Sequence, residues 1–267
     1  MDKYFTGNSI DYHQVIAIIL PILVDQAFII CLNMLNTAMI SSSGVHAVDA
    51  VNMVDSINIF LLNVFIAVST GGTVIVAQFK GANDKKMVSR SASSSISAVA
   101  LLAIAVSGIM IIFHSPILKL LFGSAGTEVF ANIKLYFIGS CISYPCFAVF
   151  EAVCGALRGV SDTKSSLGLS MITNISYVIL NLLFINVLHM GVLGMVIAVN
   201  IARFLGMICS VIYMINFNHT VNVKVRDIFK IDFPVQKRIL FIGLPFAAEQ
   251  MFFNGGKILT QIFILKL

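Results

Sequence analysis

The sequence predicts an all-α, polytopic membrane protein, and its composition and its long apolar segments both point that way. Of its 267 residues, 58% are hydrophobic and only 11% are charged, and the mean hydropathy is +0.98. A soluble domain of this size could not cover so much apolar surface. Apolar runs of about 20 residues are long enough to cross a bilayer core of roughly 30 Å as helices. A membrane barrel would instead show short strands of alternating hydrophobicity.

Seven apolar segments are expected to be transmembrane helices. In order, they are residues 15–40, 54–78, 91–113, 130–156, 167–188, 192–217 and 239–265. Residues 1–14 are mostly polar and the first apolar run is long, which argues against a cleavable signal peptide. The sequence thus predicts a six-helix lobe over residues 1–217, a linker over 218–238 and one further helix in 239–267.

A repeated pattern supports this division of the chain. Leu20-Pro21-x-x-x-Asp25-Gln26 recurs 224 residues later as Leu244-Pro245-x-x-x-Glu249-Gln250. Each copy falls within an apolar segment, and the second has only 17 residues after it. We therefore expect one complete repeat followed by the first helix of an incomplete second lobe. Internal repeats of this kind are typical of secondary transporters, whose binding sites lie between the repeats.

The basic residues predict the orientation in the membrane. With the N-terminal side taken as cytoplasmic, 12 of the 17 Lys and Arg residues fall in cytoplasmic loops or at that terminus. The positive-inside rule therefore predicts a multi-pass protein of the cell membrane with a cytoplasmic N-terminus. The formal net charge of +5 follows from this loop distribution. No soluble basic module with interleaved aromatic residues is present, so a nucleic-acid partner is not expected.

Enzymatic chemistry is not indicated by any motif. The sequence has no P-loop, dinucleotide fingerprint or His-rich metal pattern. The five cysteines lie in apolar segments without metal or redox spacing, which favours a packing role. We expect no enzyme activity, no metal site and no cofactor, with Na⁺ or H⁺ as the coupling ion of a transporter.

Ionisable residues inside apolar segments are the first candidates for a functional site. Such a group costs several kcal/mol at bilayer depth unless it is paired or faces water. Asp25 lies about ten residues into the first segment, and Arg203 lies at a similar depth from the opposite end of the sixth. The two residues either form a charge pair that holds helices together or belong to a binding site. Asp55 and Glu151 lie nearer the ends of their predicted helices and are weaker candidates.

Two polar stripes add further candidates. At 100° per residue, Asp25, Asn33 and Asn36 fall on one face of the first helix. In the fifth segment Asn174, Tyr177 and Asn181 share a face, since they are spaced i, i+3 and i+7. Such stripes either join helices by hydrogen bonds or line a wet cavity. We predict that they face one internal cavity.

Three stretches resemble the multidrug and toxic compound extrusion (MATE) family of transporters. They are Ser69-Thr70-Gly71-Gly72-Thr73 with the following Ala77-Gln78-Phe79-Lys80-Gly81-Ala82-Asn83-Asp84, then Gly155-Ala156-Leu157-Arg158-Gly159-Val160-Ser161-Asp162-Thr163-Lys164, and Gly191-Val192-Leu193-Gly194. Ile242-Gly243-Leu244-Pro245 resembles the start of the family's second half. The resemblance implies a six-helix MATE-type lobe plus the first helix of a second lobe. It also implies export of cationic or amphipathic compounds in exchange for Na⁺ or H⁺.

The resemblance also marks two departures from the family pattern. Where the family usually has Val-Asp-Thr in its first helix, with an aspartate that binds the coupling ion, this chain has Leu35-Asn36-Thr37. Asn181 stands where the fifth helix of the family often has an acid. An amide can coordinate an ion but cannot titrate, so these two positions cannot carry a coupled proton. Asp25 is then the nearest candidate for the missing charge.

Three functions compete at this point. The first is a MATE-type antiporter for small molecules. Its candidate residues for binding substrate or ion are Asp25, Asn33, Asn36, Asn174, Tyr177, Asn181 and Arg203. The second is a flippase for lipid-linked saccharides, which would need a strongly basic cavity, whereas Arg203 is the one buried cation expected here. The third is a membrane remnant that transports nothing. The expected partners are the lipid bilayer, a small-molecule substrate and, in one version, a second polypeptide that supplies the missing lobe.

Overall fold

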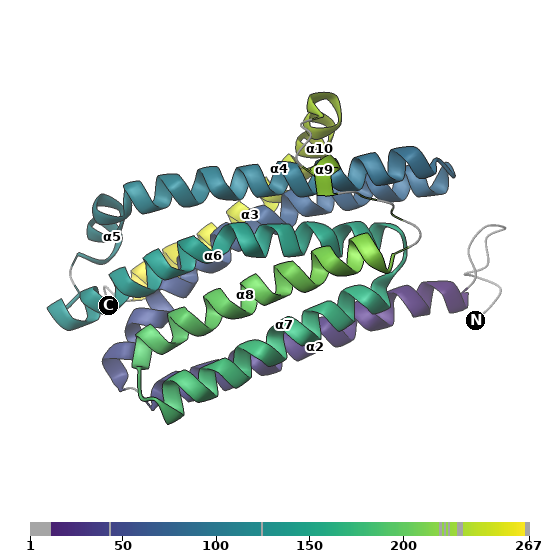
Figure 1. Ribbon diagram of the computed structural model, residues 1–267. Coiled ribbons are helices and arrows are strands. Elements are labelled where there is room, and N and C mark those ends of the chain that lie inside the picture. Colours follow the sequence, from purple (N-terminus) through teal and green to yellow (C-terminus); the bar gives the residue numbers. More distant parts are fainter. Residues whose placement is uncertain are drawn as a thin grey trace.

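The computed structural model describes residues 12–42, 44–123, 125–218, 221, 223, 225–228 and 232–264, with side chains omitted at 12–14, 33, 225, 254 and 257–264. Its long helices run side by side as one bundle (Figure 1). They are α2 (Tyr12–Ser41), α3 (Val45–Gly81), α4 (Lys85–Ile112), α6 (Thr127–Gly159), α7 (Thr163–Asn181), α8 (Gly191–Asn216) and α10 (Phe233–Ile264).

Shorter elements lie between them. The short helix α5 (His114–Phe122) follows α4, α7 continues into the π-helical turn η1 (Leu182–Val187), and α9 (Val225–Ile228) falls in the predicted linker.

Six helices in the described part of the chain are long and apolar enough to cross a membrane, which confirms the polytopic all-α fold. They cover the first six predicted segments. The seventh segment also forms a helix, α10, but this helix is not among the six. Glu249 and Gln250 fall in the middle of α10 and lower its hydropathy. α10 also begins at Phe233, inside the stretch expected to be linker.

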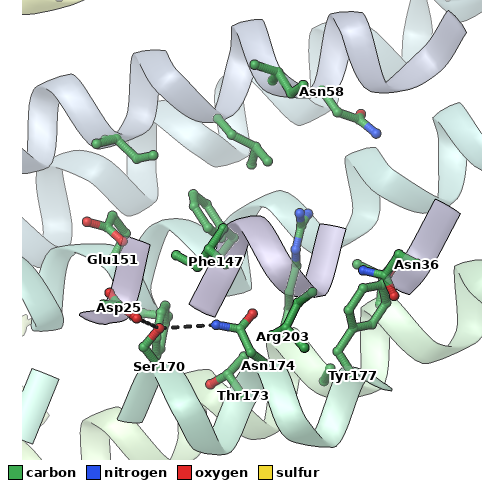
Figure 2. Close-up of a pocket in the computed structure, with 18 of the residues that line it drawn as sticks. Asp25, Asn36, Asn58, Phe147, Glu151, Ser170, Thr173, Asn174, Tyr177 and Arg203 are labelled. Atoms are coloured by element: carbon green, nitrogen blue, oxygen red, sulfur yellow. Dashed lines mark hydrogen bonds between the residues drawn. The ribbon is translucent and has the colours of Figure 1, made fainter. Parts of the chain in front are cut away.

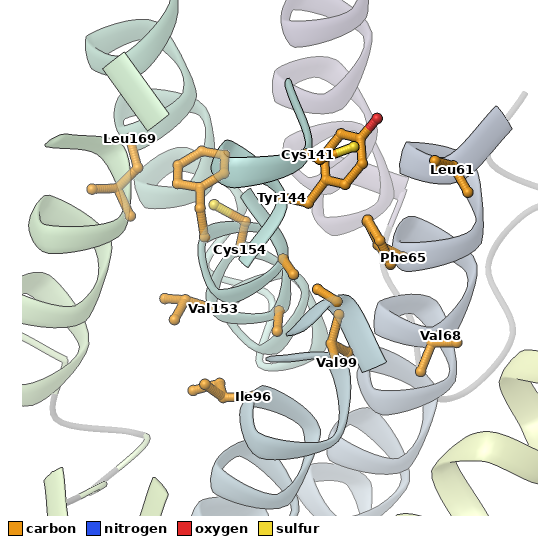
Figure 3. Packing of buried hydrophobic residues seen from close by; sticks show 14 of the residues in the cluster. Leu61, Phe65, Val68, Ile96, Val99, Cys141, Tyr144, Val153, Cys154 and Leu169 are labelled. Carbon is orange, nitrogen blue, oxygen red and sulfur yellow. The ribbon is translucent and has the colours of Figure 1, made fainter. Parts of the chain in front are cut away.

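Helix α6 is the centre of the bundle and packs against α3, α4, α7 and α8. Phe65 of α3 meets Tyr144 of α6 edge-on, with ring centroids 5.8 Å apart, and Ile96 and Val99 of α4 are buried in the same cluster (Figure 3). In the most apolar window of each helix, 67% of residues are buried in α6 but only 11% in α2. Helix α2 packs mainly on α7, so most of its surface is open to lipid or to a partner.

Close helix crossings explain the glycines of the Ser69–Thr73 stretch. A Cβ at Gly71 would lie 2.5 Å from the Ile239 carbonyl oxygen and 2.8 Å from the Gly243 nitrogen, so the backbones of α3 and α10 touch at this point. On the neighbouring face, a Cβ at Gly155 of α6 would lie 2.6 Å from Ser69 Oγ. Small residues allow membrane helices to approach this closely and gain van der Waals contact. This stretch is therefore a packing element.

The α3–α4 and α6–α7 loops share one backbone design. In each, the last helical turn ends at a residue with positive φ, Asn83 at 57° and Ser161 at 68°. The following aspartate donates its backbone N–H to the carbonyl five residues back, at 3.0 Å for Asp84 to Phe79 and 2.9 Å for Asp162 to Leu157. These bonds form a Schellman motif, which satisfies carbonyls at a helix end.

The same two aspartates then cap the next helix. Asp84 accepts a hydrogen bond from the Met87 backbone at 3.0 Å, and Asp162 accepts one from the Ser165 backbone at 3.4 Å. Asp162 also accepts from Asn218 Nδ2 at 3.1 Å, which ties the loop to the end of α8. An N-cap aspartate supplies the acceptor that a free helix N-terminus lacks. Helix termination and capping therefore explain why both loops carry an aspartate.

Candidate functional site

A cavity of about 1160 Å³ opens between α2, α3, α6, α7 and α8 (Figure 2). Apolar side chains such as Leu62 and Phe150 form part of its wall, and a set of polar side chains lies among them. Three carboxylates and two guanidiniums line the cavity: Asp25, Asp55, Glu151, Arg158 and Arg203. Charged groups inside a membrane helix bundle usually face such a cavity, because lipid cannot solvate them.

Asp25 is joined to α7. Its Oδ1 accepts a hydrogen bond from Ser170 Oγ at 2.5 Å, and Ser170 Oγ accepts one from Asn174 Nδ2 at 3.1 Å (Figure 2). Ser170 and Asn174 are four residues apart and so lie on one face of α7. The three side chains form a polar chain between α2 and α7 on the cavity wall.

The charge pair between Asp25 and Arg203, which was one alternative from the sequence, does not form between these two described residues. Arg203 instead donates a hydrogen bond from Nη1 to Ser143 Oγ at 2.6 Å. Its guanidinium carbon lies 5.1 Å from the centroid of the Phe147 ring. Both partners are on α6, so Arg203 joins α8 to α6 through neutral groups.

The two predicted polar stripes meet. Asn181 Nδ2 of α7 donates a hydrogen bond to Asn36 Oδ1 of α2 at 2.9 Å. Asn36, Asn174 and Tyr177 line the cavity, as predicted, whereas Asn181 is completely buried behind Asn36. The side chain of Asn33 lies outside the described residues.

Sequence reasoning underrated Asp55. Its Oδ1 accepts hydrogen bonds from Asn58 Nδ2 at 3.1 Å and from Tyr136 Oη at 2.9 Å. The Asn58 side chain is fixed in turn by Tyr144 Oη, which donates to its Oδ1 at 2.6 Å. Hydropathy alone places Asp55 at a helix end, because the apolar run begins at Val54. Helix α3 actually begins at Val45, so Asp55 lies almost three turns inside it.

A second missed feature is the ion pair between Glu151 and Arg158. Both residues are on α6 and both line the cavity. The fourth predicted segment ends at residue 156 and so leaves Arg158 in a loop, yet α6 continues to Gly159. The seven-residue spacing, about two helical turns, was the available signal that the two side chains share a face. The cavity therefore contains two basic residues, Arg158 and Arg203, whereas the sequence predicts Arg203 alone.

No group of three His, Cys, Asp or Glu side chains in the described ranges is arranged to hold a metal ion. The cavity is instead a polar chamber with an excess of one negative charge, counted from its three carboxylates and two guanidiniums. Its side chains can offer a ligand ion pairs, hydrogen bonds and aromatic contacts.

Comparison with known proteins decides the family. The sequence matches the MatE family over residues 21–185, which is more than half of the chain. The chain belongs to the MatE family. This result confirms the resemblance to the family, and the match includes the first two motif stretches. It agrees with a multi-pass membrane transporter fold.

Two curated relatives align with nearly the whole chain. It is 25% identical over 250 residues to "Uncharacterized transporter YisQ" of Bacillus subtilis, covering 91% of this chain and 54% of that protein. It is also 25% identical over 262 residues to "Probable multidrug resistance protein NorM" of Thermotoga maritima, covering 94% and 54%. The chain thus spans about half the length of the curated relatives it matches.

Solved structures give the same fold. An outward-facing multidrug resistance MATE family transporter of the MOP superfamily superposes with a TM-score of 0.82 at 18% identity, over 89% of this chain and 52% of that one. The inward-facing conformation of a transporter of the same description gives 0.71 at 20% identity, over 82% and 50%. At such identities the likeness establishes the MATE lobe architecture and nothing about substrate.

Proposed function

We propose that this chain forms one lobe of a secondary active antiporter that exports cationic or amphipathic small molecules in exchange for Na⁺ or H⁺. The observation that carries this proposal is the cavity, because a MatE lobe with an acid-rich chamber has the means to attract a cation. The apolar wall residues supply contact surface for an amphipathic body. Within this proposal, a second polypeptide would supply the other lobe.

The flippase alternative receives less support. A pyrophosphate head group would require an excess of basic side chains, and here carboxylates outnumber guanidiniums. Arg158 is also neutralised by Glu151. The charge of the cavity therefore favours the exporter.

Within this proposal, Asp25 is the proton-coupling group. It can titrate, whereas Asn36 and Asn181 cannot, and its side-chain hydrogen bond among the described residues comes from the neutral Ser170. In one conformation Asp25 would bind substrate or proton, and the bond to Ser170 would couple that event to the packing of α2 on α7. Release of the proton would restore the carboxylate for the next cycle.

The test is uptake of ethidium, a fluorescent cation, into everted membrane vesicles that contain the chain and a co-expressed second lobe. A pH or Na⁺ gradient should drive uptake in the wild type. Asp25→Asn should abolish the pH-driven component, while Asp49→Asn should not, because Asp49 is exposed and outside the cavity. Absence of gradient-driven uptake in the wild-type complex would support the third alternative, a membrane protein that transports nothing.

Location belongs to the same proposal. We propose that the protein resides in the cell membrane with its N-terminus in the cytoplasm, on the basis of the loop distribution of Lys and Arg. In this orientation the two Schellman loops face the cytoplasm.

A further inference from the structure

Arg203 is a charged side chain whose hydrogen bond and ring contact are both with neutral groups. It lies near the middle of α8, at a depth where an ionised group needs a partner. Its side-chain partners in the described contacts are the Ser143 hydroxyl and the Phe147 ring. A guanidinium carries five N–H donors in a planar fork, and Ser143 accepts one of them. Arg203 also lines the cavity, so the remaining donors are accessible from it.

Asp55 is held in a similar way with the opposite charge. Its donors, Asn58 and Tyr136, are neutral, and both act on the same oxygen, Oδ1. Asp55 also lines the cavity, and no ion pair joins it to Arg203 in the described part of the chain. Two opposite charges attract each other, and Asp55 and Arg203 do interact electrostatically. Specific contacts with neutral groups are therefore needed to keep them from closing into an ion pair.

Helix α6 provides those contacts. Tyr136, Ser140, Ser143, Tyr144 and Phe147 lie on one face of it, since they are spaced i, i+4, i+7, i+8 and i+11. The anchor of Asp55 is Tyr136 and the anchor of Arg203 is Ser143. These anchors are seven residues apart, which is about 10 Å along a helix. One wall of the cavity therefore presents a carboxylate and a guanidinium at separate, fixed positions.

We propose that the cavity binds a zwitterionic substrate, with Arg203 pairing with its carboxylate and Asp55 with its cationic group. This inference rests on the proposed transport function and narrows its substrate class. A planar guanidinium matches a carboxylate with two parallel hydrogen bonds, and such charge-assisted bonds are stronger than neutral ones. Phe147 beneath the guanidinium offers its ring to an aromatic part of the same ligand. The bound ligand places a group of opposite charge in direct contact with each of these two side chains.

The experiment compares two probes that differ in one charge. A rhodamine with a free carboxylate is a zwitterion, and its methyl ester keeps the same fluorescent ring system but is a cation. Binding of both to the purified full chain in nanodiscs is followed by fluorescence anisotropy, which needs no transport. The wild type should bind the free acid more tightly than the ester.

Three variants then assign the groups. Arg203→Gln should weaken binding of the free acid about tenfold or more and leave the ester unchanged, so that the preference disappears. Arg203→Lys, which keeps the charge, should retain part of the preference. Asp55→Asn should weaken both probes, because both carry the cationic ring system. Arg238→Gln is the matched control, since Arg238 also contacts a neutral amide and an aromatic ring but is exposed and outside the cavity.

Different outcomes bear on the zwitterionic substrate and on the exporter function. Equal affinity of the wild type for acid and ester, or an equal loss of both in Arg203→Gln, would overturn the inference and leave the proposed exporter intact. Binding of neither probe to the wild type would count against the proposed substrate class of the exporter, and the inference would fail with it. If Arg203→Gln does not fold, Arg203→Lys still tests the inference. Complete loss of the preference for the free acid in Arg203→Lys would contradict a role for the positive charge.

Discussion

A methyl group added at Gly71 tests whether α10 docks on α3 as the structure shows. The new Cβ would lie 2.5 Å from the Ile239 carbonyl oxygen and 2.8 Å from the Gly243 nitrogen. Both are backbone atoms, so no side chain can rotate away. Gly71→Ala must therefore separate the two helices or shift one along the other.

The magnitude follows from two opposing effects. Overpacking a tight contact costs about 1–3 kcal/mol, while replacing glycine by alanine within a helix stabilises it by roughly 0.5–1 kcal/mol. The net effect is a destabilisation of up to about 2.5 kcal/mol, or up to about 10 °C in Tm for a chain of this size. Gly108→Ala is the control, because Gly108 is inside α4 and a Cβ there meets nothing within 4 Å.

The assay is thermal unfolding of the purified protein in one detergent, combined with hydrogen exchange along α10. Gly71→Ala should lower Tm and increase exchange in α10, whereas Gly108→Ala should leave Tm unchanged or raise it. The reasoning is refuted if Gly71→Ala is as stable as Gly108→Ala and exchange in α10 is unaltered. In that case α10 would not be held against α3 in solution.

Three further predictions concern loops and caps. In a cysteine-free background, an impermeant maleimide applied outside the cell should label Ser43→Cys and spare Lys164→Cys, and the reverse pattern would invert the predicted orientation. Asp84→Ala should cost about 1 kcal/mol of stability, because it removes an N-cap. Asp162→Ala should cost about 2–3 kcal/mol, because Asp162 also accepts hydrogen bonds from Ser165 Oγ and Asn218. Equal losses of stability in thermal unfolding would contradict this order. Arg90 forms an ion pair with Asp232 and holds the pKa of that carboxyl below its ordinary value. The resulting stabilisation is complete above about pH 4 and is lost as the pH falls through the lowered pKa, so exchange at the start of α10 should rise there in the wild type but show no such step in Arg90→Gln.

Depth in the membrane could be predicted from the sequence, but the rotation of one helix against another could not. Counting residues placed Asp25 and Arg203 at similar depth, yet α2 packs on α7 and Asp25 meets Ser170 instead. The contact between Asn36 and Asn181 was foreseeable because each lies on a polar stripe of an otherwise apolar helix. Periodicity identifies such stripes, while the choice of partner depends on packing between helices distant in sequence.

Helix ends were the other source of error, and they concealed part of the site. Hydropathy detects only the apolar part of a helix, so α3 was predicted to begin at Val54 although it begins at Val45. The polar first turns include Asp49 and Asn52, which lower the local hydropathy without ending the helix. Asp55 was underrated for this reason, and the hydrogen bonds from Asn58 and Tyr136 could not be anticipated.

The residues that identify the family and the residues that line the cavity are largely different sets. Gly71 and Gly155 allow helices to touch, and Asp84 and Asp162 close loops and cap helices. These roles depend on backbone geometry and not on the charges of the cavity. Asp55 and Arg203 contact side chains of α6 on the cavity wall, and these contacts do not serve the backbone. A sequence can therefore keep the motifs of the family while changing the charges of its chamber, and the substrate must be inferred from those charges.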